Sequence, residues 1–183
     1  MRRCLTMVRG LAVIGCASLA ACQTFSQDGG MSVTADIAGK TLDKDVVAIR
    51  SEEDEAAARA KVERLLKRAL TADSAVQIAL LNNRGLQATY NELGIAEAIR
   101  VQQSLPPNPH FSVTRITGSV ETEIERQIVA SILALATLPV RSEFATERFR
   151  QAQLAAALAT LRVAAEARRA FYRAVAAQEI VGL

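Results

Sequence analysis

One long heptad pattern between residues 141 and 181 constrains the fold more than any other feature of the sequence. A helix of ~40 residues is ~60 Å long and needs a partner along its length. We expect Leu154, Leu158 and Leu161 to form the densest part of its packed seam, with Tyr172 further along. The seam should face the helix at 73–104 or a neighbouring subunit. Its positions are Leu154, Leu158, Leu161, Ala165, Arg168, Tyr172, Val175 and Glu179.

A second long helix is predicted between residues 73 and 104, with Thr71 or Asp73 as its N-cap. Its apolar positions follow helical spacing, and Ile95 and Ile99 add a second apolar edge, which indicates neighbours on two sides. The sequence LPPNP at 105–109 ends the helix, because proline lacks a backbone donor and disfavours helix in the residue before it.

The hydrophobic period changes to two after these prolines. The alternation at 111–117 predicts a strand, and Gly118 and Ser119 form a turn. From 124 to 138 the even positions are mostly apolar and the odd ones begin polar, as in a strand between lipid and a wet lumen. The same segment also suits a helix, so periodicity leaves both structures open. Pro139 closes it, and the long helix is expected from about Arg141.

The region before residue 70 is predicted to contain one amphipathic helix. Ser51 caps it, and Asp54 occupies the capping-box position. Residues 46–49 are apolar and are expected to dock as an extended segment. Residues 23–44 show no helical period and are interpreted as a linker.

The N-terminus has the order of a bacterial lipoprotein signal. A basic tip precedes a short apolar run and the sequence Leu-Ala-Ala-Cys, which ends at Cys22. The run is too short for a permanent span, which needs ~20 apolar residues. We therefore expect residues 1–21 to be a signal peptide and residues 22–50 a lipidated N-terminal linker. Gln23 stands where an inner-membrane retention signal would usually place Asp, which favours the outer membrane of a Gram-negative bacterium.

Removing the signal changes the charge and the thiol content. The chain has 22 basic and 19 acidic residues, and the signal holds three arginines and no acid, so 22 less 3 leaves 19 basic against 19 acidic. This balance argues against a nucleic-acid partner. Cys4 and Cys16 leave with the signal and Cys22 is lipidated, so no thiol remains for catalysis or metal binding.

The sequence predicts no enzyme and no cofactor. His110 is the only histidine and lies beside the prolines, where a surface or packing role is expected rather than metal ligation or base catalysis. Glu121, Glu123 and Glu125 would share one strand face. They are interpreted as a solvated strand end, with a pore-lining acid ring as the alternative.

Several segments, in this order and spacing, resemble the outer-membrane efflux (TolC-like) family. They are LTADSAV at 70–76, ALLNN at 79–83, LQA at 86–88, GIAEA at 94–98, LPPNP at 105–109 with Phe111, LPVR at 138–141, Arg148 with Phe149, and RRAFY at 168–172. The resemblance covers roughly residues 70–181. It departs from the family at Ser74, where an acid is usual, and at Arg84 and Gly85, where proline commonly follows the asparagine pair.

The resemblance implies a mainly α fold with a small β part. Long, antiparallel, coiled-coil-like helices would carry a two-strand unit of a trimeric outer-membrane barrel, and residues 124–138 would then be strand. Family protomers hold two helix–strand–strand–helix repeats, so residues 51–183 would be the first repeat of a protein that is apparently truncated.

The implied function is the channel component of a tripartite efflux or type I secretion system. Its partners would be outer-membrane lipid, a periplasmic adaptor and an inner-membrane pump, with a homotrimer as the complete assembly. A non-channel, periplasmic, helical lipoprotein that serves as an interaction module is the alternative.

Overall fold

The computed structural model describes residues 25–117 and 122–182, and it is mainly helical with one small antiparallel sheet. The mainly α expectation with a small β part is therefore confirmed. In chain order the elements are α2 (Ser32–Leu42), α3 (Glu52–Leu66), α4 (Ala72–Asn82), α5 (Arg84–Ser104), β1 (His110–Thr117), β2 (Thr122–Val129), α6 (Ile132–Ala136) and α7 (Leu138–Val181).

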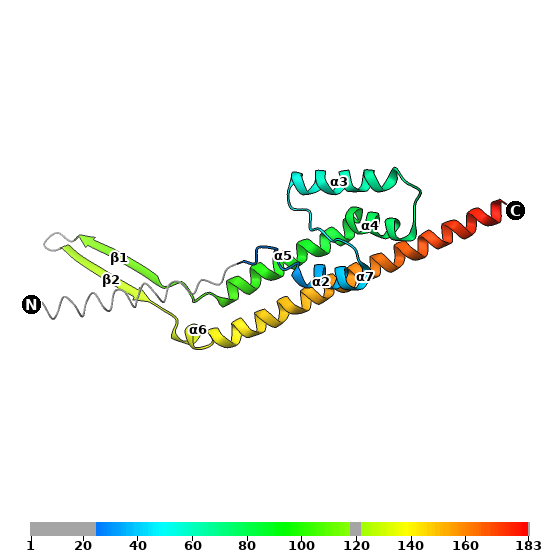
Figure 1. The fold of residues 1–183 in the computed structure, drawn as a ribbon. Coiled ribbons are helices and arrows are strands. Elements are labelled where there is room, and N and C mark those ends of the chain that lie inside the picture. Colours follow the sequence, from blue (N-terminus) through cyan, green and yellow to red (C-terminus); the bar gives the residue numbers. More distant parts are fainter. Residues whose placement is uncertain (1–24, 118–121, 183) are drawn as a thin grey trace, which may run out of the picture.

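The long helix α7 is the axis of the molecule. It contains 44 residues, which corresponds to about 66 Å. It begins at Leu138 rather than near Arg141, because Pro139 lies in its first turn, where the missing N–H has no intrahelical partner to lose. Helices α4 and α5 follow one another along α7, and α2 packs on it as well (Figure 1).

The predicted single helix from 73 to 104 is wrong in one respect, because the structure breaks it at Asn83. This residue is extended (φ −79°, ψ 108°), and its side chain accepts a hydrogen bond from the Leu86 N–H. Asn83 thereby caps α5, which satisfies an N–H that a new helix start leaves open.

Capping boxes begin the two helices that precede this break. The Thr71 and Ser74 side chains each accept from the other's backbone N–H, so Ser74 fills the acid's usual position in the box. Ser51 and Asp54 form the corresponding box at the start of α3, as predicted. The hydrogen bonds from the Arg50 and Ser51 N–H groups hold the pKa of Asp54 below its usual value.

The strand that the resemblance implies for residues 124–138 is wrong in its second half, where periodicity had left helix open. Strand β2 ends at Val129, and Ser131 then caps the short helix α6 by accepting from the Ala134 N–H. The strand therefore ends at Val129, although the sequence remains mostly apolar up to residue 138. The alanine and leucine content of 132–138 favours helix, and that preference prevails.

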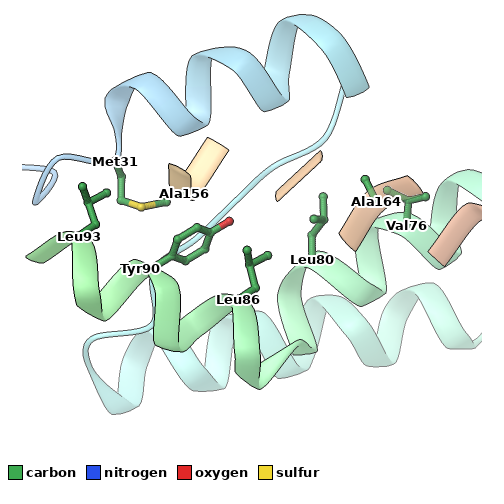
Figure 2. Close-up of a cluster of buried hydrophobic side chains, with 8 residues drawn as sticks. All are labelled: Met31, Val76, Leu80, Leu86, Tyr90, Leu93, Ala156 and Ala164. Atoms are coloured by element: carbon green, nitrogen blue, oxygen red, sulfur yellow. The ribbon is translucent and has the colours of Figure 1, made fainter. Parts of the chain in front are cut away.

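Bulky side chains of α4 and α5 fill the core, and they pack on small side chains of α7. Figure 2 shows Leu80, Leu86, Tyr90 and Leu93 along one face of α4 and α5, opposite Ala156. The small residues of α7 allow the helices to approach closely, so the large side chains on the other side fill the space. The buried residues of α7 are Ala145, Ala156, Ala157, Thr160 and Ala164.

This packing corrects the prediction for the leucine seam. Leu154 and Leu158 are 52% and 58% exposed, Tyr172 is 59% exposed, and Leu161 is half-buried. They lie on another face of α7, so the seam is not the contact with α4 and α5. Contact with a neighbouring subunit, the other part of the prediction, stays a prediction.

Candidate functional site

The β1–β2 hairpin extends away from the helices at the end where α5 stops (Figure 1). Helix α5 ends with its Leu105 cap in an extended conformation (ψ 143°), and the proline-rich residues 106–109 lead into β1. On the return path, α6 joins β2 to the start of α7. The helix pair therefore holds the hairpin at one end of the molecule.

The pairing of the strands places each hairpin residue on one of two faces. Strand pairing is antiparallel from His110 opposite Val129 to Thr117 opposite Thr122. Directly opposite residues share a face, and successive residues alternate between faces. We call the two faces A and B. Face A holds Phe111, Val113, Arg115, Thr117, Thr122, Ile124, Arg126 and Ile128, and face B holds His110, Ser112, Thr114, Ile116, Glu123, Glu125, Gln127 and Val129.

Four large apolar side chains on face A are open to solvent. Phe111, Val113, Ile124 and Ile128 are between 53% and 72% exposed. The sheet has only these two strands among the described residues, so each strand keeps one edge without a backbone partner. A lone hairpin with an exposed apolar face and two open edges is marginally stable in water, and it is suited to pairing with further strands or to contact with lipid.

The predicted acidic cluster falls on the opposite face. Glu123 and Glu125 occupy face B positions opposite Ile116 and Thr114, whereas Glu121 lies outside the described residues. Glu125 is exposed, as expected for a solvated strand. His110 is exposed at the base of the hairpin, opposite Val129, in line with the surface role expected for it.

Residues 25–50, which we call the N-terminal strap, are folded onto the helices, so the interpretation of residues 23–44 as a linker is wrong from residue 25 onward. The strap contains α2, whose Thr34 and Ala38 are fully buried. At the start of the strap, the Ser26 N–H donates a hydrogen bond to Glu97 Oε1 at 2.7 Å. Glu97 is only 1% exposed and also forms an ion pair with Arg100 at 3.6 Å. The strap therefore satisfies a buried carboxylate of α5.

A glycine turn completes this docking. Gly30 adopts φ +81°, and a Cβ placed there would lie 2.6 Å from Cζ of Phe149, so a larger residue would meet both strain and a clash. Gln153 of α7 donates from Nε2 to the Gly30 carbonyl at 3.0 Å. Met31 then enters the core beside Leu93 and Ala156 (Figure 2). Glycine at this position is typical of a loop, but Gln153, which holds Gly30, lies 123 residues away in the sequence.

Two glutamines hold the extended end of the strap. Gln77 accepts from the Asp45 N–H at 3.0 Å and donates to the Asp45 carbonyl at 2.9 Å. Gln87 accepts from the Ile49 N–H and donates to the Val47 carbonyl, both at 2.9 Å. The predicted docking of residues 46–49 as an extended segment is thus confirmed. Side-chain amides satisfy the backbone groups of this segment, because no strand lies beside it among the described residues.

A buried hydrogen-bond chain joins α5 to α7 beneath the strap. The Tyr90 hydroxyl lies 2.8 Å from Thr160 Oγ1, which in turn donates to the Ala156 carbonyl at 2.9 Å. Because Thr160 already donates to that carbonyl, Tyr90 is the donor in the first bond. Burial raises the pKa of Tyr90 above its usual 10.0.

The other predicted site residues stand apart from the hairpin. Cys22, the lipidation candidate, lies outside the described residues, four positions before Ser26. Within 25–117 and 122–182, no group of three or more His, Cys, Asp or Glu residues could hold a metal ion. The helices among these residues include none with the length and apolar character needed to cross a bilayer.

No known protein family, curated protein or solved structure compared with this chain matches it.

Proposed function

We propose that this chain is a component of an outer-membrane channel, of the kind that serves tripartite efflux or type I secretion. In the complete assembly, a homotrimer, the hairpin would supply strands to a shared barrel and the helices would extend into the periplasm. A periplasmic adaptor and an inner-membrane pump would then be its partners, and Cys22 would carry the lipid anchor.

The amphipathic hairpin is the observation that carries this proposal. Face A presents Phe111, Val113, Ile124 and Ile128 to the outside, and face B presents mainly polar residues. A barrel wall needs this division, because one face of each strand meets lipid and the other meets a wet lumen. The open edges of both strands are the groups that neighbouring hairpins would pair with, since unpaired backbone groups are too costly in lipid.

The position of the strap also supports an arrangement with the hairpin at the membrane and the helices in the periplasm. Glu97, which binds Ser26, lies seven residues before the end of α5, which corresponds to about 10 Å along the helix. Cys22 is four residues from Ser26, so the chain between them spans at most about 14 Å. A lipid on Cys22 can therefore reach the end of the helices from which the hairpin extends.

Single cysteines on the two faces of the hairpin test the proposal in isolated outer membranes. Val113→Cys lies on face A, Thr114→Cys lies on face B, and Gln151→Cys on the exposed surface of α7 is the control. A membrane-impermeant maleimide should label the α7 and face B cysteines and spare the face A cysteine. Native gels of mild-detergent extracts should also show the protein as an oligomer.

Equal labelling of all three cysteines would mean that both faces of the hairpin lie in water. That result, together with a monomer on native gels, would reject the channel and favour the periplasmic interaction module. Face A protection without an oligomer would place the hairpin on a membrane but would reject a shared barrel.

A further inference from the structure

The charges of the hairpin are divided between its faces. Arg115 and Arg126 both lie on face A, and the acidic positions Glu123 and Glu125 both lie on face B. No carboxylate position of the described hairpin residues therefore shares a face with either arginine. Face A combines an exposed apolar surface with two cations, which is unusual for a surface that meets only hydrocarbon.

The register brings the two arginines together. Arg115 is opposite Ile124, and Arg126 is opposite Val113, so the arginines are diagonal neighbours on adjacent strands. Diagonal positions have Cα atoms roughly 7–8 Å apart, within reach of long side chains. Two guanidinium groups at this spacing can donate to the oxygens of one phosphate, for which the planar donor fork of arginine is well suited.

The height of this pair on the hairpin indicates what face A contacts. The pair lies midway along β1 and β2. Phe111 and Ile128 lie toward the base, Val113 and Ile124 are directly opposite the arginines, and the positions of Thr117 and Thr122 lie beyond them. Arginine is strongly unfavourable on the lipid face at the bilayer midplane and nearly neutral at the interface. Each strand has eight residues and reaches about 26 Å, less than the ~30 Å of a hydrocarbon core even before tilting.

We infer that face A binds the headgroup layer of anionic phospholipid, with Arg115 and Arg126 sharing a phosphate and the apolar residues entering the adjacent acyl region. This inference rests on the membrane role proposed for the hairpin. It specifies that role, because it assigns face A an anionic lipid partner and places the middle of the hairpin at the interface rather than at the centre of the bilayer.

Vesicle flotation of the mature chain tests the inference. The chain carries Cys22→Ala, so that no acyl chain contributes to binding, and the vesicles are phosphatidylcholine with or without phosphatidylglycerol. Anionic surfaces attract each nearby arginine enough to change binding about fivefold. We therefore expect Arg115→Gln with Arg126→Gln to weaken binding to phosphatidylglycerol vesicles by roughly 25- to 30-fold. A higher salt concentration should also weaken the binding of the unsubstituted chain to phosphatidylglycerol vesicles.

Two further variants separate headgroup recognition from net charge and from apolar contact. Arg148→Gln with Arg162→Gln removes the same charge from exposed positions of α7 and should change binding little. Val113→Ser with Ile128→Ser removes apolar surface from face A and should weaken binding to both kinds of vesicle. These hairpin residues lie outside the helical core, so circular dichroism should show unchanged helices in the hairpin variants.

Three results would overturn the inference. Equal losses for the hairpin and α7 arginine pairs would mean that only net charge matters. Equal binding to both vesicle types, with sensitivity only to the serine pair, would leave face A as a lipid-facing surface without headgroup recognition, and the channel proposal would stand. Absence of binding to either vesicle would remove the lipid partner, and the labelling of Val113→Cys in native membranes would then decide the channel proposal separately.

Discussion

Replacing Thr160 with valine should destabilise the contact between α5 and α7 that supports the hairpin. Valine has nearly the same shape as threonine, so the change removes hydrogen bonds without opening a cavity. The Tyr90 hydroxyl, on a side chain that is 1% exposed, would lose the acceptor that lies 2.8 Å away. A buried polar group left unpaired costs about 1–3 kcal/mol.

The reciprocal change should cost less, and the pair should be coupled. Tyr90→Phe removes the donor but leaves Thr160 donating to the Ala156 carbonyl, so we expect a loss of about 0.5–1.5 kcal/mol. The double variant leaves no unpaired hydroxyl. Its loss should therefore be smaller than the sum of the single losses by about 1 kcal/mol.

Urea unfolding of the mature chain, followed by circular dichroism, measures these differences. With a denaturant slope of about 2 kcal/mol per molar, a loss of about 2 kcal/mol lowers the midpoint by about 1 M. Thr146→Val is the matched control, because Thr146 also donates to the carbonyl four residues earlier on α7 but is exposed. Equal midpoints for Thr160→Val and Thr146→Val would refute the reasoning, since the buried bond would then add nothing to stability.

Four other predictions concern the core, the seam, the hairpin and the anchor. Burial raises the pKa of Tyr90 in the folded state, so the stability linked to this group is complete below the unfolded pKa of about 10 and is lost as pH rises through the folded pKa. Urea titration at several alkaline pH values should therefore show a smaller fall in the free energy of unfolding for Tyr90→Phe than for the unsubstituted chain. Leu158→Asp should change the melting temperature of the lipid-free, monomeric chain little, because Leu158 is exposed. Ala157→Asp buries a charge and should lower the free energy of unfolding by about 3–5 kcal/mol. Equal losses of melting temperature for the two variants in the monomer would contradict the observed packing. Planar-bilayer recordings of the purified monomer should show no steady unitary conductance, because the open edges of a lone hairpin leave backbone groups unpaired in lipid; a reproducible conductance from the monomer would count against this. Cys22→Ala should abolish fatty-acid labelling in growing cells, and label retained by this variant would reject the anchor.

Local signals in the sequence located α3, the helical region of α4 and α5, strand β1 and α7. The caps at Ser51 and Thr71, the prolines after Leu105 and the alternation from Phe111 each act through atoms a few residues away. Their outcomes could therefore be predicted without the rest of the fold. The register that divides the hairpin into faces A and B was not predicted, because it depends on the pairing of two strands and not on the local period of either one. The turn expected at Gly118 and Ser119 lies outside the described residues.

The errors occurred where local preference was weak and distant contacts decided. Asparagine has a low helix propensity but a high preference for the N-cap, so Asn82 and Asn83 fit both a continuous helix and a break, and the structure has the break. The strap was interpreted as a linker because nothing near Gly30 reveals that Phe149, Gln153 and Glu97 would surround its docking site.

Spacing in the sequence predicts that α7 is long, that it needs partners and that a strand follows the prolines. Which face of α7 is buried depends instead on the packing of the whole chain. Heptad spacing favoured the leucines, yet Ala156, Thr160 and Ala164 form the contact, because α4 and α5 bring the bulky side chains and α7 must supply room for them. Side-chain volume is shared between two packed surfaces, so the pattern of one helix cannot determine which of its faces fits the other.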